Sequence, residues 1–250
     1  MAKLTKEQSK KHQQCLELIN SDKPLTWEEK DYIIENYQES YAQLNSLSGA
    51  FFTPEGLARD FNLEVPENAD IVDLCAGIGC LSLWALRMKH PKSIKCVELN
   101  PDYIKVGKRI LPEAEWVNSD ALDFCDALSK TQQMFGVGKT FDVAVSNPPF
   151  GRINTSENNT CIYTGGDFEF KIIEKSMLVA RDGVFIVPQG STPFKYSGQH
   201  SFQQLKTGKA INFMSQTGIH LEPNCGIDTS IYKNEWKGVS VICEVVLASC

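Results

Sequence analysis

Short apolar runs alternate with amphipathic segments through residues 68–188 of this chain. Runs of this length, bounded by turn residues, are typical of buried strands, and they fall at 71–74, 94–98, 116–119, 141–146 and 183–188. Segments with helical spacing lie between them, at 81–89, 101–110, within 117–128 and at 168–181. This alternation predicts an α/β fold with a parallel, doubly wound sheet. The polar stretches 131–140, 151–167 and 189–209 are expected to be loops.

Two capping-box patterns mark the N-terminal part of the chain. Thr5-Lys6-Glu7-Gln8 and Thr26-Trp27-Glu28-Glu29 each place a Glu or Gln three residues after a Thr. They predict helices near 6–19 and 27–39. We therefore expect an N-terminal helical extension at 1–48, followed by one α/β domain at 49–250, which is an ordinary size for a single core.

The amino-acid composition argues against membrane, secreted and metal-binding classes of protein. Hydrophobic residues make up 42% of the chain and charged residues 22%, as in soluble globular proteins. No apolar run approaches the roughly 20 residues of a membrane span, and the first residues lack the apolar core of a secretory signal. The nine cysteines contain no Cys-x-x-Cys pair, so neither a metal cluster nor a disulfide framework is expected. We expect a cytoplasmic protein that binds no metal.

The net charge of −6 argues against a basic face over the whole molecule. Binding of nucleic acid depends on local clusters of cations rather than on the total. Two such clusters follow predicted strands: Arg152, and the loop that carries Lys195 and Tyr196. These three residues are the candidate substrate contacts.

The most specific string in the chain is Asn147-Pro148-Pro149-Phe150, which directly follows the strand predicted at 141–146. In open α/β sheets ligands bind at the carboxyl ends of the strands, so the string is expected at a binding edge. A strand-ending turn is the plain alternative, since Asn-Pro is a common turn dipeptide.

A glycine-rich turn follows the first predicted strand. Asp73 lies in that strand, and Gly77 and Gly79 come directly before a helix. The glycines permit a tight turn and close approach of a ligand to the backbone. Dinucleotide-binding folds share this pattern. Two further strands end in acids, Glu98 and Asp120.

A third motif, Phe51-Phe52-Thr53-Pro54, lies upstream of the turn and precedes a helix-like run at 56–61. A helix start explains the same residues, with Thr53 as N-cap and Pro54 at the first helical position. Both interpretations are compatible, because the N-terminus of a helix favours a carboxylate.

In their order along the chain, the Phe-Phe-Thr-Pro segment, the glycine-rich turn with its acids and the Asn-Pro-Pro-Phe string resemble class I methyltransferases that depend on S-adenosylmethionine (SAM) and modify amino groups, above all N6 of adenine. The resemblance covers residues 49–190 and is to the bacterial and phage DNA type. It implies a Rossmann-like fold with a mostly parallel seven-stranded sheet, closed by an antiparallel hairpin that residues 210–221 and 239–248 would supply.

The resemblance also implies roles for individual residues. Asn147 and the Pro148 carbonyl would accept the amino hydrogens, and Phe150 would stack on the base; the catalytic residues are Asn147, Pro148, Pro149 and Phe150. SAM is the implied cofactor, and its sulfonium and amino group suit carboxylates. The implied cofactor contacts are Phe52, Thr53, Asp73, Ala76, Gly77, Gly79, Glu98, Leu99, Asp120, Ala121 and Asn147.

The expected function is methylation of adenine N6 in DNA, in a restriction-modification or phage setting. Only 100 residues follow Phe150, and completing the sheet uses most of them. That leaves no room for a separate target-recognition domain. We expect short or relaxed specificity, or specificity supplied by a homodimer or a partner subunit.

Three alternatives remain. An RNA base-amino methyltransferase, acting on adenine N6 or guanine N2, fits the missing recognition domain equally well. Protein-glutamine methyltransferases carry similar tetrapeptides but favour Tyr at the fourth position, where this chain has Phe150. A catalytically silent SAM-binding scaffold is disfavoured because all four residues of the tetrapeptide are intact.

Overall fold

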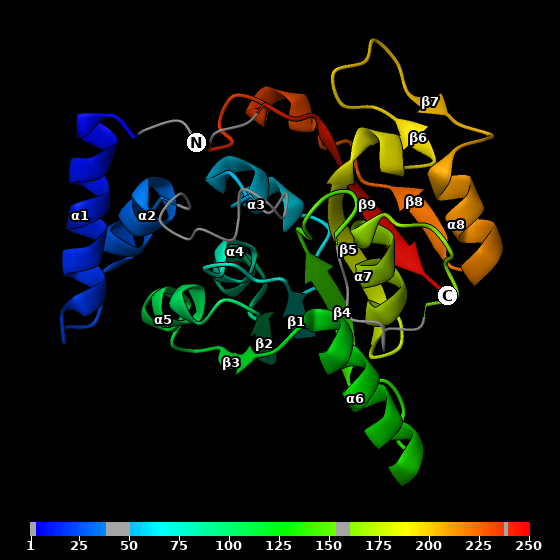
Figure 1. Cartoon of the computed structure of the whole chain (residues 1–250), viewed down its shortest axis with the longest axis horizontal. Coiled ribbons are helices and arrows are strands. Elements are labelled where there is room, and N and C mark those ends of the chain that lie inside the picture. Colours follow the sequence, from blue (N-terminus) through cyan, green and yellow to red (C-terminus); the bar gives the residue numbers. More distant parts are fainter. Residues whose placement is uncertain (1–3, 39–50, 154–160, 238–239) are drawn as a thin grey trace.

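A mixed seven-stranded sheet forms the centre of the molecule (Figure 1). The computed structural model describes residues 4–38, 51–153, 161–237 and 240–250. The strands run in the order β3-β2-β1-β4-β5-β9-β8, and β9 is antiparallel to both neighbours. Their bounds are β1 Asp70–Leu74, β2 Ser93–Glu98, β3 Glu115–Asn118, β4 Phe141–Ser146, β5 Ala180–Pro188, β8 His220–Pro223 and β9 Cys243–Ser249. This confirms the predicted fold class, including the antiparallel hairpin at the edge.

Helices cover both faces of the sheet. They are α3 Glu55–Phe61, α4 Cys80–Lys89, α5 Pro101–Ile110, α6 Ala121–Phe135, α7 Phe168–Ser176 and α8 Lys209–Thr217. Successive strand residues point to opposite faces. Ile71 of β1 therefore packs in one core with α3, α4 and α5, whereas its neighbour Val72 packs in a second core with α6, α7 and α8.

The N-terminal helices α1 (Lys6–Asn20) and α2 (Trp27–Asn36) lie beside α3, α4 and α5 (Figure 1). Both predicted capping boxes are present. Arg109 of α5 donates to the carbonyl of Lys23 at 2.6 Å, and Lys237 donates to the carbonyls of Ile34 and Tyr37. The predicted division at residues 48 and 49 lies outside the described residues and stays a prediction.

Three predicted boundaries are wrong. Helix α6 continues to Phe135, where a loop was expected, and Gly136 ends it with φ 64°. Helix α8 occupies most of 210–221, because Ala210 and Phe213 form a buried face at helical spacing, so the strand there is limited to β8. Helix α7 ends at Ser176, and β5 begins at Ala180 within the segment expected to be helical.

Short secondary-structure elements accompany the main sheet after β5. They are two 3₁₀ turns, η3 (Gln189–Ser191) and η4 (Thr229–Tyr232), and a two-stranded ribbon of β6 (Phe194–Lys195) with β7 (Gln203–Gln204). Among the described residues, no helix is long and apolar enough to span a membrane.

The contact between Gly107 of α5 and Trp116 of β3 gives a test of this packing. A Cβ atom on Gly107 would lie 2.1 Å from the Trp116 ring. We predict that Gly107→Ala destabilises the protein by about 1–3 kcal/mol through overpacking, although Ala is favoured over Gly in an open helix by about 1 kcal/mol. Urea unfolding measures the difference.

The matched background for this test is Trp116→Phe, which removes the ring atoms that meet the new methyl group. There Gly107→Ala is expected to be neutral or stabilising. A Gly107→Ala protein as stable as the parent in both backgrounds would contradict the packing described.

Candidate active site

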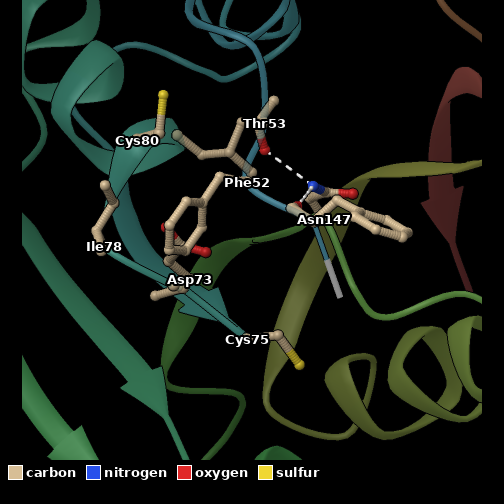
Figure 2. Close-up of a pocket in the computed structure, with 11 residues that line it drawn as sticks. Phe52, Thr53, Asp73, Cys75, Ile78, Cys80 and Asn147 are labelled. Atoms are coloured by element: carbon tan, nitrogen blue, oxygen red, sulfur yellow. Dashed lines mark hydrogen bonds between the residues drawn. The ribbon is translucent and has the colours of Figure 1, made fainter. Parts of the chain in front are cut away.

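The carboxyl ends of three neighbouring strands meet at one edge of the sheet. β1 pairs in parallel with β2 and β4, and Asp73 is the register partner of both Cys96 and Val145. The residues that follow these strands therefore converge (Figure 2). They include the glycine-rich turn after β1 and Asn147 after β4, while Glu98 is the last residue of β2.

The glycine-rich turn is tied to β2. The Gly77 N–H donates to Glu98 Oε2 at 2.8 Å, and the Ala76 N–H donates to the carbonyl of Val97 at 3.1 Å. Gly77 has φ 57°, a left-handed conformation that favours glycine. Burial raises the pKa of Glu98, although hydrogen bonds from the Asn100 and Gly77 amides act in the other direction. The turn and the second acid thus form one unit.

Asp73 is a buried carboxylate with one oxygen available. It is 1% exposed, and its Oδ2 accepts a hydrogen bond from the Ser82 hydroxyl at 2.6 Å. Its Oδ1 has no hydrogen-bond partner in the described part of the chain. Burial raises the pKa of Asp73 to about 7. A buried carboxylate oxygen without a donor suits a cationic ligand group.

Asn147 has a fixed orientation. Its Nδ2 donates to the carbonyl of Phe51 at 2.9 Å and to the Thr53 hydroxyl at 3.0 Å (Figure 2). Since a backbone carbonyl only accepts hydrogen bonds, these contacts decide which side-chain atom is the nitrogen. The Asn147 Oδ1 is buried and has no partner among the described residues. This oxygen can therefore accept a hydrogen bond from a ligand.

Asn147 and Asp73 line the same small cavity. Its volume is about 30 Å³, which is room for little more than water, since one water molecule needs about 10–15 Å³ on the same measure. The lining residues are Phe51, Phe52, Thr53, Asp73, Cys75, Ala76, Gly77, Ile78, Cys80, Leu81 and Asn147. The ring of Phe52 lies against Gly77, where a Cβ atom would be 3.3 Å from the ring.

The residues that line this cavity fit SAM, because they include a glycine turn and a buried carboxylate with one unpartnered oxygen. The cavity in this structure is too small to hold SAM, since pockets for ligands of this size measure about 300–1,000 Å³. The Phe52 ring lines the cavity, and we predict that it shifts when the cofactor enters. This ring packs edge-on against Tyr103, with centroids 4.9 Å apart.

Thr53 does not cap the following helix. The N-cap of α3 is Pro54, and no side chain caps it. The Thr53 hydroxyl instead accepts the hydrogen bond from Asn147. The helix-start interpretation of Thr53 is therefore wrong, and the motif joins the strand-end Asn to the segment that closes over the turn.

Several predicted cofactor contacts lie at the same edge but outside the cavity lining. These are Gly79, Glu98, Leu99, Asp120 and Ala121. Asp120 caps α6, since its Oδ1 accepts from the Leu122 N–H at 2.8 Å. Leu99 is 65% exposed, whereas Ala121 is buried. Their roles stay predictions.

The predicted substrate residues lie farther out. Pro148 is buried, and Pro149 and Phe150 are half-buried; the Phe150 ring meets Trp236 with centroids 6.5 Å apart. Arg152 is exposed, and Lys195 and Tyr196 are half-buried in and after β6. None of these residues lines the cavity that holds Asn147.

Sequence reasoning missed several residues that shape this edge. Ser82, Trp236 and the buried carboxylate Glu244 are among them. Glu244 accepts from the Tyr196 and Ser197 amides and so holds the loop of the predicted substrate residues. A signal existed for Ser82, which lies on the helix that the glycine turn begins; none existed for residues 236 and 244, which follow the motifs by about 90 positions.

A seven-stranded sheet of this order, with the glycine turn after β1, is the fold of class I SAM-dependent methyltransferases. Residues 57–163 match the family described as "Methyltransferase small domain". This match supports the predicted class of enzyme, a SAM-dependent methyltransferase, and SAM as its cofactor. Transfer to an amino nitrogen stays a prediction.

Two relatives with assigned activities share part of the chain. A "tRNA1(Val) (adenine(37)-N6)-methyltransferase" of Flavobacteriaceae bacterium (strain 3519-10) is 24% identical over 52% of this chain and 56% of its own. The "rRNA N(6)-adenosine-methyltransferase metl-5" of Caenorhabditis elegans is 30% identical over 50% of this chain and 54% of its own. The matched region therefore spans about half the length of each relative.

Solved structures share the fold. The methyltransferase subunit of a type I restriction-modification system from Streptococcus thermophilus superposes with a TM-score of 0.53 at 15% identity, over 88% of this chain and 49% of that one. A candidate RNA methyltransferase of Pyrococcus horikoshii superposes with a TM-score of 0.50 at 16% identity, over 82% of this chain and 89% of that one.

Asp73 gives a pH test of the cofactor site. We predict that Asp73→Asn weakens SAM binding at pH 8, because the variant lacks the charge that faces the cavity. As the pH falls through 7, the wild-type carboxylate takes up a proton and this advantage is lost. With a pKa of about 7, the ratio of the two dissociation constants is expected to fall about tenfold from pH 8 to pH 6.

Isothermal titration calorimetry of both proteins at the two pH values measures this ratio. Because Asp73→Asn cannot ionise at this position, the pH dependence of its SAM affinity reports the ionisation of SAM itself. Equal dissociation constants at pH 8 would show that Asp73 does not face the cofactor.

Proposed function

We propose that this protein transfers a methyl group from SAM to N6 of adenine in RNA. The observation that carries the proposal is the buried, unpartnered Oδ1 of Asn147. Two partly matching relatives are named for adenine-N6 methylation of tRNA and rRNA. They favour RNA, the alternative weighed from the sequence, over the DNA substrate first expected.

The proposed role of Asn147 follows from its hydrogen bonds. Phe51 and Thr53 occupy both hydrogens of its amide nitrogen, so its oxygen, which can only accept, is the atom left for a ligand. An exocyclic amino group is a weak nucleophile because its lone pair is delocalised into the ring. Accepting one of its hydrogens at Oδ1, and the other at the Pro148 carbonyl, would draw the nitrogen toward a tetrahedral geometry in which its lone pair is localised and faces the methyl group. The N–C bond would form as the S–C bond of SAM breaks, and the methylated nitrogen would then lose one proton.

The remaining residues bind and orient. Asp73, Gly77 and Glu98 would hold SAM, which supplies an electrophilic methyl group when bound. Phe150 would stack on the adenine, and such stacking is worth about 1–3 kcal/mol per base. Trp236 packs against Phe150 and limits its movement. A base inside an RNA duplex must leave the base stack to reach Asn147.

Recognition beyond the base rests on fewer residues. Arg152, Lys195 and Tyr196 are the proposed contacts to the RNA backbone. A homodimer or partner subunit that adds specificity, and a cytoplasmic location, stay predictions from the sequence.

The first test changes Asn147. We predict that Asn147→Ala lowers the rate of methyl transfer by about 100-fold or more, as removal of one group that stabilises developing charge does elsewhere. SAM affinity should stay within about twofold, since the proposed contact is to the substrate. Turnover and the SAM dissociation constant are measured on the same preparation. Retained turnover would rule out this role.

The second test identifies the acceptor. We expect tritiated methyl from SAM to enter RNA transcripts more than duplex or single-stranded DNA, and to elute as N6-methyladenosine after nucleoside digestion. Label in DNA alone would restore the first expectation. Label in guanosine or in protein would keep the chemistry and change the substrate. SAM binding without any transfer would indicate a scaffold.

A further inference from the structure

A buried carboxylate on α7, Glu169, joins two segments that flank the proposed acceptor site. It is 1% exposed and lies in the first turn of the helix. Its Oε2 accepts from the Gly151 N–H at 2.9 Å, and its Oε1 accepts from the Ser191 hydroxyl at 2.7 Å. Gly151 directly follows the Asn-Pro-Pro-Phe tetrapeptide, and Ser191 ends the turn after β5.

Gly151 is held mainly by polar contacts with α7. Its carbonyl accepts from the Phe168 N–H at 2.8 Å, and the next residue, Arg152, forms a β-bridge with Asp167. Gly151 has φ 83°, and among the described residues no heavy atom beyond its chain neighbours lies within 4 Å of the position that a Cβ would take. Packing on that side therefore does not fix this residue, and the Glu169 carboxylate restrains its N–H.

The charge of Glu169 is not explained by an ion pair. None involves it among the described residues. A carboxylate in the first turn of a helix is favoured by the helix dipole. A buried carboxylate that has no cation beside it can be stabilised by hydrogen-bond donors instead. Both donors to Glu169, from Gly151 and Ser191, come from loops at the site.

We propose that Glu169 is a positioning residue for the tetrapeptide. By fixing Gly151, it sets the direction of the Pro148 carbonyl and of the Phe150 ring, and through Ser191 it links them to the loop that leads to Lys195. The mechanism rests on the proposed function, because it assumes that the tetrapeptide receives the acceptor base. Glu169 itself touches neither substrate nor cofactor.

The test shortens the side chain and keeps its charge. Glu169→Asp withdraws the carboxylate by one methylene group. We expect kcat to fall about 10- to 100-fold, as misplacement of a reacting group by about 1 Å does, while the SAM dissociation constant stays within about twofold. Glu169→Gln should recover most of the rate, since its oxygen can still accept from Gly151 and its nitrogen can donate to Ser191.

Glu174→Asp is the matched control. Glu174 is a buried carboxylate of the same helix that accepts from the Ile162 and Tyr163 amides, at 2.6 and 2.9 Å, rather than from the residue that follows the tetrapeptide. Its shortening should leave kcat within about threefold of wild type. A loss equal to that of Glu169→Asp would show that only loop folding is affected and would overturn the proposal.

A second readout needs no activity. Hydrogen exchange of the Gly151 amide, followed by NMR after selective ¹⁵N-glycine labelling, should be faster in Glu169→Asp and unchanged in Glu174→Asp. Unchanged exchange in Glu169→Asp overturns the proposal, as does faster exchange with an unchanged kcat. Wild-type protein that methylates no RNA would refute the proposed function instead, while the exchange result still decides whether Glu169 holds Gly151.

Discussion

The parallel pairing of β1 with β2 on one side and with β4 on the other is the constraint on which the site depends. It brings the carboxyl ends of three strands to one edge, where the Ser146 hydroxyl donates to the carbonyl of Leu74, 72 positions earlier in the chain. Asp73, Glu98 and Asn147 lie at or beside those ends. A shift of one residue in either register would turn their side chains to the opposite faces of the sheet.

Unsatisfied buried polar atoms are rare, and here they cluster. The side chains of the described residues contain three: Oδ1 of Asn62, of Asp73 and of Asn147. Two of the residues that carry them, Asp73 and Asn147, line one cavity. Leaving such an atom without a donor costs about 1–3 kcal/mol. A fold that accepts this cost twice at the end of neighbouring strands has a site prepared for a ligand with hydrogen-bond donors or positive charge.

Local signals predicted the elements that lie within one run of sequence. The strand at 141–146 and the helix at 101–110 have the expected bounds, because turn residues and Pro101 mark their ends. The position of the tetrapeptide at the carboxyl end of a parallel strand also predicted that it lies at a binding edge. The bond from Asn147 to Phe51 spans 96 positions and depends on how a loop folds back, so no local pattern encodes it.

Two further features needed the tertiary structure. Helix α8 was not predicted because its apolar residues are few, and packing of Phe213 against Phe170 stabilises it. In the sequence, Glu169 is one more acid in the first turn of a helix. Only the tertiary structure shows that Gly151 and Ser191 both donate to its carboxylate. Residues that position others leave little trace in a single sequence, since their partners are distant in the chain.

A crystal structure with S-adenosylhomocysteine and adenosine bound tests the central claim most directly. The account predicts that the adenine N6 lies at hydrogen-bond distance, about 2.9 Å, from Asn147 Oδ1, with Phe52 displaced from Gly77. An adenine bound elsewhere, or an Asn147 oxygen that turns to a protein donor in that complex, would contradict it.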